Sequence, residues 1–258
     1  MSVQFIASKD NPKIKHLRAL IQQAAYRKKQ QQTVLEGTHL CLAWLEQHSH
    51  LHALYTTEHA LTHADFEKIQ QHYNGHIFVI SEALYKELST LGTSIACMAV
   101  IDIPRHQHAF DPQADTLILE NIQDPGNVGT LLRSAAAAGI QQILTTTGSA
   151  ALWSPRVLRA GMGAHFALQC YEHIALEVAL AQFKIPVYVT SLEQAQSLYS
   201  LDLSRACVWI LGNEGQGVSD YALAHAQAVT IPQPGGQESL NVAIAGSVCM
   251  FEMVRQRL

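Results

Sequence analysis

The hydrophobic positions of this chain form short apolar runs that alternate with stretches of helical spacing. Two of these runs, residues 208–211 and 228–231, each end at a polar, glycine-rich turn, and the second turn leads into a long apolar helix expected to begin near Ser239. Buried parallel strands have this form, and open α/β sheets bind ligands in the loops that follow the carboxyl ends of their strands. The stretch 208–257 therefore predicts a small-molecule site built mainly from backbone, with polar side chains such as Asn213 beside it.

The first part of the chain, up to residue 104, alternates between strand-like and helix-like patterns. A helical pattern runs from Pro12 to Ala25, and Ser81 is expected to cap a later helix, because a serine hydroxyl can satisfy free N–H groups of a first turn. The segments expected to form strands are 33–36, 51–56, 76–80 and 94–102, and further helices are expected over 38–47 and 60–73. This alternation is typical of a compact α/β domain.

Residues 104–113 interrupt the pattern, because they hold two prolines and few aliphatic side chains. We therefore expect a first domain over 1–104, a linker over 105–113 and a second domain over 114–258. In the second domain, strands are expected at 117–120, 142–146, 187–190, 208–211 and 228–231, with helices between them that include 128–139 and 157–160. This order predicts a parallel, helix-covered sheet, for which periodicity alone favours an ordinary doubly wound nucleotide-binding fold.

The composition is that of an ordinary globular protein. The chain has 258 residues, enough for one large domain or two small ones, of which 48% are hydrophobic and 15% are charged. No run of about 18 apolar residues is present, so no membrane span is expected, and residues 1–18 lack the apolar core of a secretion signal. The five cysteines are scattered and form no C-x-x-C pair. We therefore expect buried free thiols and a cytoplasmic location.

The net charge of −4 is unevenly distributed along the chain. Residues 1–32 hold seven lysines and arginines against Asp10 alone, a net charge of +6, so the remainder carries −10. A basic segment on an acidic body suits contact with a polyanion through one end, and a solvated basic helix is the alternative. Charge supports nucleic-acid binding only when a second signal joins it.

The first polar cluster, residues 124–133 (DPGNVGTLLR), comprises a predicted turn and the start of the helix that follows it. Pro125 and Gly126 predict a tight turn, and Asn127 is a candidate cap for the helix. Arg133 follows about two turns into that apolar helix, where an arginine must extend to water, form a salt bridge or face a functional cleft. The pattern leaves a structural salt bridge and a functional role open. It excludes a phosphate-binding P-loop, because G-x-x-x-x-G-K is absent.

Two further polar clusters follow the last two predicted strands. Residues 211–217 (LGNEGQG) place Glu214 in a glycine-rich turn, and residues 231–243 (IPQPGGQESLNVA) place Ser239 and Asn241 at the start of a helix. Taken singly, the first is compatible with an ordinary glycine turn and the second with a helix N-cap at Ser239. The three clusters in this order on one sheet are a much more specific signal than any one of them.

Together the three clusters resemble the three motifs of the SpoU (TrmH-like) branch of the SPOUT methyltransferases, enzymes that methylate ribose 2′-hydroxyls of RNA. The resemblance covers the chain from Leu117 to its end, and residues 8–17 (SKDNPKIKHL) and 34–40 (VLEGTHL) resemble the family's N-terminal substrate-binding domain. It implies an α/β fold with a C-terminal trefoil-knot domain built on a parallel sheet and a smaller N-terminal α/β domain similar to a ribosomal protein. A trefoil knot threads the chain through a loop, which periodicity cannot reveal.

The resemblance also implies the site, its cofactor and its partners. The implied catalytic residues are Asn127, Arg133, Glu214, Ser239 and Asn241. The residues implied to hold S-adenosylmethionine, largely through backbone, are Thr190, Leu211, Gly212, Ile231 and Leu240. The implied assembly is a homodimer through the knotted domain, with the active site at the subunit interface. The implied reaction needs no metal, and the spacing of the fourteen histidines includes no metal-binding motif.

Three positions depart from the family pattern. Gln233 stands where methionine is frequent and Ser134 where threonine is frequent, and both changes are expected to be harmless. Residues 90–100 lack the Gln-Gly that usually precedes the last strand of the N-terminal domain. This third departure bears on how the N-terminal domain fits a standard substrate.

The chemistry that the resemblance implies requires little beyond positioning. A methyl group on a sulfonium is already electrophilic, so the rate depends on in-line placement and on activating the 2′-hydroxyl. The family's motif-one arginine, here Arg133, is the proposed base, but a guanidinium with a pKa above about 12 rarely loses a proton. The alternative is that Arg133 binds the RNA phosphate and stabilises the developing alkoxide.

The sequence leaves the RNA target open. A separate N-terminal domain favours ribosomal RNA over transfer RNA, and the overall acidity favours a short folded target over nonspecific duplex binding. Two other functions are alternatives: a non-catalytic RNA-binding assembly factor that keeps the fold, and a nucleotide-dependent enzyme with another cofactor. Retention of the five polar motif residues argues against the assembly factor.

Overall fold

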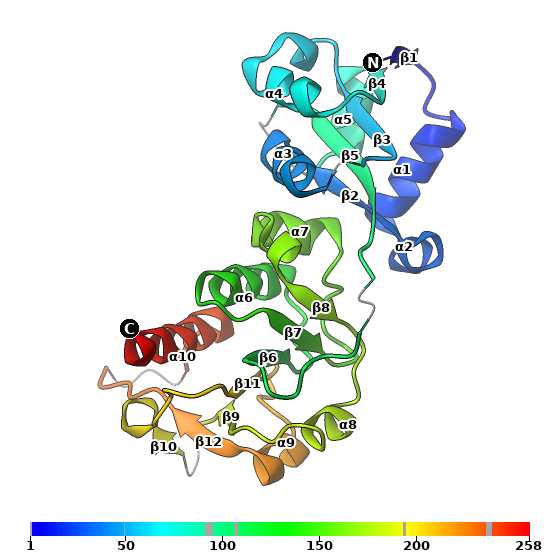
Figure 1. The fold of residues 1–258 in the computed structure, drawn as a ribbon. Coiled ribbons are helices and arrows are strands. Elements are labelled where there is room, and N and C mark those ends of the chain that lie inside the picture. The colour runs from blue at the N-terminus through cyan, green and yellow to red at the C-terminus, as the bar shows by residue number, and fades with distance from the viewer. Residues whose placement is uncertain (1, 49, 91–94, 106–107, 193–194, 236–238) are drawn as a thin grey trace. The chain divides into compact units, whose positions relative to one another are not determined.

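The computed structural model describes the chain except for residues 1, 49, 91–94, 106–107, 193–194 and 236–238 (Figure 1). Contacts divide the chain into two compact units. The first comprises Met1–Arg105 and Trp153–Phe166, and the second comprises His106–Leu152 and Ala167–Leu258. The division into domains 1–104 and 114–258, with a linker over 105–113, remains a prediction. The segment Trp153–Phe166, which falls within the predicted second domain, belongs to the first unit.

In the described part of the first unit, a five-stranded sheet has the order β1-β4-β3-β5-β2. Its strands are β1 (Ser2–Ile6), β2 (Gln32–Glu36), β3 (Ala53–Thr56), β4 (His76–Ile80) and β5 (Cys97–Asp102). Strand β5 runs antiparallel to β2 and β3, whereas β4 is parallel to β1 and β3. The helical segments are α1 (Pro12–Gln22), α2 (Ala24–Gln30), α3 (Thr38–Gln47), η1 (Ala60–Thr62), α4 (Ala64–His72), α5 (Glu82–Leu88), α7 (Pro155–Gly161) and, at the boundary, η2 (Ala164–Ala167).

The predicted helix from Pro12 to Ala25 is divided into α1 and α2. Asn11 caps α1, because its side chain accepts a hydrogen bond from the N–H of Lys13 at 2.9 Å. The buried guanidinium of Arg27, in α2, donates to the main-chain carbonyl of Leu20 at 2.8 Å and so satisfies the carboxyl end of α1. Arg27 therefore has a structural role within the basic N-terminal segment.

Strand β1 is not predicted by the sequence pattern, because four of its five residues are exposed and it pairs with β4 at the edge of the sheet. The predicted cap of α5 is confirmed, since the hydroxyl of Ser81 accepts a hydrogen bond from the N–H of Leu84 at 3.2 Å. The predicted strand 94–102 begins at Cys97 in the described residues, and the predicted helix 60–73 is divided into η1 and α4.

Two hydrogen bonds hold the segment Trp153–Phe166 within the first unit. The hydroxyl of Thr33 donates to the carbonyl oxygen of Trp153 at 2.6 Å. The guanidinium of Arg159 donates to the carbonyl oxygen of Thr90 at 2.8 Å. Both acceptors are main-chain atoms, so the contacts depend on the backbone course of the segment.

In the described part of the second unit, a seven-stranded sheet has the order β10-β12-β9-β11-β6-β7-β8, and all of its neighbouring strands are parallel (Figure 1). Its strands are β6 (Thr116–Leu119), β7 (Gln142–Thr145), β8 (Gln169–Tyr171), β9 (Val187–Thr190), β10 (Gln196–Ser197), β11 (Val208–Leu211) and β12 (Gln227–Thr230). The helical segments are α6 (Pro125–Ala137), α8 (Leu176–Leu180), η3 (Leu198–Ser200), α9 (Asp220–His225) and α10 (Val242–Arg257).

Strand β6, the first of this sheet in the chain, has strands on both of its sides. Strands β7 and β8 extend one side, and β9 to β12 form the other side, with β11 placed directly against β6. The predicted parallel sheet is confirmed, and the strands predicted at 187–190 and 208–211 coincide with β9 and β11. The sequence pattern does not predict β8 and β10, which have three and two residues.

Two helix starts differ from the sequence-based interpretation. The N-cap of α6 is Asp124, whose carboxylate accepts a hydrogen bond from the N–H of Asn127 at 2.7 Å, so the prediction that Asn127 caps this helix is wrong. The N-cap of α10 is Asn241, which accepts hydrogen bonds from Ala243 at 2.9 Å and Ile244 at 3.2 Å. Helix α10 therefore begins after Asn241 rather than near Ser239. Both residue types are favoured N-caps, which is why the sequence does not separate them.

Helix α10 packs closely against α6 and β11 (Figure 1). A Cβ atom at Gly246 would lie 2.4 Å from the side chain of Leu211 and 2.5 Å from that of Leu131, both of which are fully buried. The hydroxyls of Ser134 and Ser247 are hydrogen-bonded at 2.7 Å between the two helices. Glycine is therefore required at position 246 for this approach of α10.

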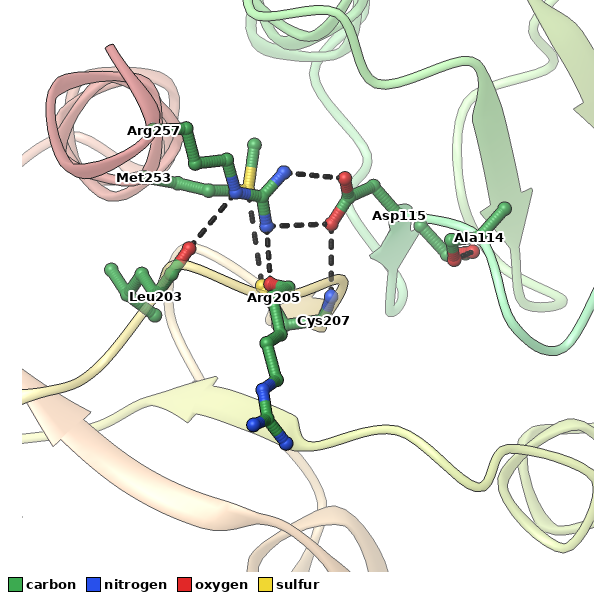
Figure 2. Close-up of polar contacts among 8 residues, drawn as sticks. Ala114, Asp115, Leu203, Arg205, Cys207, Met253 and Arg257 are labelled. Carbon is green, nitrogen blue, oxygen red and sulfur yellow. Dashed lines mark hydrogen bonds and ion pairs between the residues drawn. The ribbon is translucent and has the colours of Figure 1, made fainter.

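The carboxyl end of α10 is fixed by Arg257. Figure 2 shows its guanidinium between the carboxylate of Asp115 and the carbonyl oxygen of Leu203, to which it donates at 2.9 Å. The pair with Asp115 uses both guanidinium Nη atoms, at 2.5 and 3.1 Å. The same carboxylate accepts the N–H of Cys207 at 2.8 Å, just before β11. These bonds tie the end of α10 to the segments that precede β6 and β11.

The five cysteines are buried and lie outside any disulfide in the described part of the chain. Burial raises the pKa of the Cys207 and Cys249 thiols to about 12. Because the thiolate is the nucleophilic form, neither thiol is reactive near neutral pH. Among the described residues, no helix combines the length and the apolar content needed to cross a membrane.

Candidate active site

A cavity of about 650 Å³ opens in the second unit at the carboxyl ends of three neighbouring strands. Thr190 is the last residue of β9, Gly212 follows β11 directly and Ile231 follows β12 directly, and all three line the cavity. Asn241 and the first turn of α10 complete its wall. The cavity has the size of a small-molecule site and lies where open parallel sheets bind ligands.

The loop between β11 and α9 is held rigidly beside the cavity. The amide of Asn213 donates to the carbonyl oxygen of Asn121 at 2.9 Å and accepts the N–H groups of Gly215 and Gln216 at 2.9 and 3.0 Å. A Cβ atom at Gly212 would lie 2.4 Å from the backbone of the same loop, so this position requires glycine. The sequence pattern predicts Asn213 as a polar neighbour of the site. In the structure its side chain also holds this loop through three hydrogen bonds.

Three of the predicted catalytic residues are joined by hydrogen bonds. The amide nitrogen of Asn127 donates to the carboxylate of Glu214 at 2.9 Å, and the amide nitrogen of Asn241 donates to the side-chain oxygen of Asn127 at 3.0 Å. One residue comes from each of the three polar clusters, and 87 and 114 positions separate the bonded pairs. The fold therefore assembles these clusters at one place. We call these three residues the polar triad.

The remaining predicted residues lie at different places. Ser239 and Leu240 line the cavity with Glu214 and Asn241, whereas Asn127 lies beside the cavity through its hydrogen bonds. Leu211 does not line the cavity, because its side chain is fully buried at the end of β11 and packs near Gly246.

Arg133 is exposed on α6 and does not line the cavity of its own chain. Within the described residues, its side chain has no hydrogen bond or ion pair. The structural salt bridge that the sequence leaves open is therefore not found among them. The guanidinium is a permanent cation that is available to a partner from outside the chain.

The cavity combines acidic, apolar and uncommitted polar groups. The charged side chains among its described lining residues are Glu214 and Asp220, which favour a cation. Leu192 and Leu223 also line the cavity, and their side chains are 60% and 40% exposed. A ligand with an apolar surface would cover them. Gln233 also lines it, and its Oε1 is buried without a hydrogen-bond partner in the described part of the chain. This donor set fits a ligand with a positive charge, an apolar face and hydrogen-bonding edges.

Sequence reasoning did not assign a site role to Gln233, Leu192 or Asp220. The signal for Gln233 is its departure from the methionine that is frequent at this position, and neither of the others carries a comparable signal. Among the described residues, no group of three or more histidine, cysteine or acidic side chains is arranged to hold a metal ion.

Two family models match the chain, one for each end. The model of the SpoU rRNA Methylase family matches residues 115–251, which include the cavity and the polar triad. The model of the MRM3-like substrate binding domain matches residues 11–99, within the first unit.

Known proteins are similar along almost the whole chain. An uncharacterized tRNA/rRNA methyltransferase of Synechocystis sp. is 35% identical, over 98% of this chain and 94% of its own length. The 23S rRNA guanosine-2′-O-methyltransferase RlmP of Bacillus subtilis is 28% identical, over 96% of this chain and 98% of its own length. The crystal structure of an RNA 2′-O ribose methyltransferase is similar with a TM-score of 0.85 and 27% identity, over 98% of this chain and 99% of that chain.

Proposed function

Because this chain belongs to the SpoU rRNA methylase family, we propose that it transfers a methyl group from S-adenosylmethionine to a ribose 2′-hydroxyl in structured RNA. Ribosomal RNA is the favoured target, and transfer RNA is the alternative. The predicted resemblance is confirmed by both family models. The predicted fold class, a trefoil-knot domain on a parallel sheet with a smaller N-terminal α/β domain, is confirmed by the similar crystal structure.

The single observation that supports the site best is the hydrogen-bonded polar triad beside the cavity. An assembly factor would have no need to keep Asn127, Glu214 and Asn241 in mutual contact across the fold. The contacts also orient each group: Asn127 donates at one end of its amide and accepts at the other, so its rotation is restricted. This preorganisation is what a catalytic role requires.

The cavity suits the cofactor that this family uses. S-adenosylmethionine supplies a methyl group on a positively charged sulfur, which makes that methyl electrophilic. We propose that Gly212, Ile231 and Leu240 hold the cofactor largely through backbone, with Thr190 at the end of β9. The carboxylates of Glu214 and Asp220 complement its positive charge.

The role that we propose for Arg133 is electrostatic. A guanidinium offers several N–H donors and no acceptor, so it is better suited to binding an anion than to accepting a proton. It would bind the RNA phosphate beside the target and stabilise the alkoxide that develops as the 2′-hydroxyl loses its proton. The polar triad would orient the ribose.

The position of Arg133 supports a homodimer in which the active site lies at the interface. Arg133 does not line the cavity of its own chain, and the neighbouring helix α10 carries Ile244 and Phe251, which are 54% and 47% exposed. Because these two residues are seven positions apart, they lie on the same face of the helix. We propose that α10 pairs with a second copy through this face and brings Arg133 of one protomer to the cavity of its partner.

The first unit is proposed to bind the RNA. Its match to a substrate-binding domain is the main support, and the exposed Lys9, Lys28 and Lys29 supply positive charge for phosphate contacts. A cytoplasmic location is proposed because the five buried cysteines form no disulfide among the described residues, as is usual in a reducing compartment.

The test of this function separates chemistry from cofactor binding. Arg133→Ala is expected to abolish methylation of RNA, while calorimetry shows S-adenosylmethionine binding close to that of the wild-type protein. Arg205→Ala is the matched control, because it removes an exposed guanidinium from the same unit that is not among the residues lining the cavity. Loss of cofactor binding to the same degree as activity in Arg133→Ala would contradict the proposed role.

A further inference from the structure

Gln233 differs from the other amide side chains that line the cavity. Asn213 and Asn241 are committed to hydrogen bonds within the protein, and Gln216 is exposed to water. Gln233 is only partly accessible, and its Oε1 is closed off from water without gaining a protein donor in the described part of the chain. The hydrogen-bonding capacity of this oxygen is therefore unused in a side chain that lines the cavity.

An unpaired amide oxygen in such a place requires an explanation. It has lost its hydrogen bonds to water and has received none in return, which destabilises the ligand-free protein. Rotation about the last side-chain torsion exchanges the oxygen and nitrogen ends of the amide at little cost. A ligand with a donor and an acceptor side by side on one flat edge would satisfy both ends of Gln233.

The adenine ring is the part of the cofactor that has such an edge. Its exocyclic amino group donates and the adjacent ring nitrogen accepts, which is the pattern that a glutamine amide pairs with in two parallel hydrogen bonds. The positively charged parts of the cofactor are better matched by the carboxylates of Glu214 and Asp220. The apolar side chains of Ile231 and Leu223, which also line the cavity, suit the faces of a purine.

We propose that Gln233 recognises the adenine edge of S-adenosylmethionine and determines the nucleobase selectivity of the cavity. This inference rests on the proposed function, because it takes that cofactor as the occupant. It also replaces the expectation that glutamine in place of methionine is harmless. Methionine at this position would supply packing alone, whereas glutamine supplies a donor and an acceptor.

The experiment compares two ligands and three proteins by calorimetry. The ligands are S-adenosylhomocysteine and its 6-desamino analogue, in which purine replaces adenine. The wild-type protein is expected to bind the adenine ligand about tenfold more tightly than the purine analogue, since one hydrogen bond of ordinary strength is lost. Gln233→Met is expected to lose most of this discrimination. Gln182→Met, which removes an exposed amide that bonds to Val178 outside the cavity lining, is expected to keep it.

Thermal unfolding without ligand gives an independent readout. Because Gln233→Met removes an unpaired buried oxygen, its melting temperature is expected to equal or exceed that of the wild-type protein. A purely structural glutamine would give the opposite result. The inference would be overturned if the Gln233→Met protein kept the wild-type discrimination between the two ligands, or if it bound both ligands more weakly by the same factor. Absence of binding of either ligand to the wild-type protein would overturn the proposed function as well, so the two failures are distinguishable.

Discussion

Asn127 shows at the scale of a single residue how the site depends on an amide. Its nitrogen donates to the carboxylate of Glu214 and its oxygen accepts from Asn241, so it needs a donor at one end and an acceptor at the other. Asp124, rather than Asn127, caps helix α6, which leaves the side chain of Asn127 free for these contacts. The asparagine amide supplies the donor and the acceptor from two separate atoms at the end of a short side chain.

Asn127→Asp is therefore expected to disrupt the polar triad while keeping its volume. The change replaces a donor facing Glu214 by a second negative charge, and hydrogen bonds to charged groups are worth about 1.5–3 kcal/mol. The methylation rate is expected to fall by about tenfold or more, while cofactor affinity changes little because Asn127 does not line the cavity. Single-turnover rates and calorimetry check this. An Asn127→Asp protein with wild-type rates would show that the triad has no catalytic role.

At the scale of secondary-structure elements, helix α10 connects the site to the body of the second unit. Asn241 caps its first turn and belongs to the polar triad, while Arg257 at its other end binds Asp115 (Figure 2). Between them, Gly246 allows close packing on Leu131 and Leu211. The position of Asn241 in the site is therefore determined by contacts along the whole helix.

Glu252 makes the hydrogen bonds in the last turns of this helix sensitive to acid. Its carboxylate accepts hydrogen bonds from Arg255 at 2.7 Å and from Gln256 at 2.8 Å. Hydrogen bonding to Arg255, and then to Gln256, lowers the pKa of Glu252 from 4.5 to about 2. The contribution of Glu252 to stability is thus fully present above the unfolded-state pKa and is lost as the pH falls through about 2.

Glu252→Gln is expected to lower the free energy of unfolding at neutral pH and to have a decreasing effect as the pH approaches 2. The substitution removes the ionised acceptor but keeps the size of the side chain. Urea unfolding of both proteins at a series of pH values measures the difference. A difference that stays constant over this range would show that the ionised form of Glu252 does not stabilise the fold.

The elements that carry the site were predictable from sequence, but their contacts were not. Strands β9 and β11 match the predicted 187–190 and 208–211, because buried parallel strands leave unbroken apolar runs. Strand β10, with two residues at the sheet edge, leaves no such pattern. The contact between Asn127 and Glu214 depends on the order of the strands, which periodicity does not specify. Only the family resemblance implied that these two residues belong to one site. The unpaired oxygen of Gln233 is a property of packing and has no counterpart in the sequence pattern.

At the scale of the whole molecule, the proposed role of Arg133 involves a second copy of the chain. Arg133 lies outside the cavity of its own chain, and its helix, α6, contacts helix α10, which carries the exposed Ile244 and Phe251. A homodimer through this face would cover Ile244 and Phe251 and place two active sites at one interface.

If the proposed dimer forms through this face of α10, Phe251→Asp is expected to convert it to monomer and to abolish methylation. A charge in the centre of an apolar interface is costly, and a shift of the dissociation constant by at least about a hundredfold is expected. Sedimentation velocity measures the assembly. Val178→Asp, which places the same charge at an exposed valine on α8, is the matched control and is expected to leave the dimer intact. A Phe251→Asp protein that remains dimeric would place the interface elsewhere.

The position of a transferred label in alkali-treated RNA distinguishes methylation of a ribose 2′-hydroxyl, the proposed reaction, from methylation of a base. Ribosomal RNA from cells lacking the gene is incubated with the protein and S-adenosylmethionine labelled in its methyl group, and then hydrolysed in alkali. A methylated 2′-hydroxyl cannot attack the adjacent phosphate. If the protein methylates the ribose, the label is therefore expected in alkali-resistant dinucleotides. Label in mononucleotides, which marks base methylation, or absence of label would contradict it.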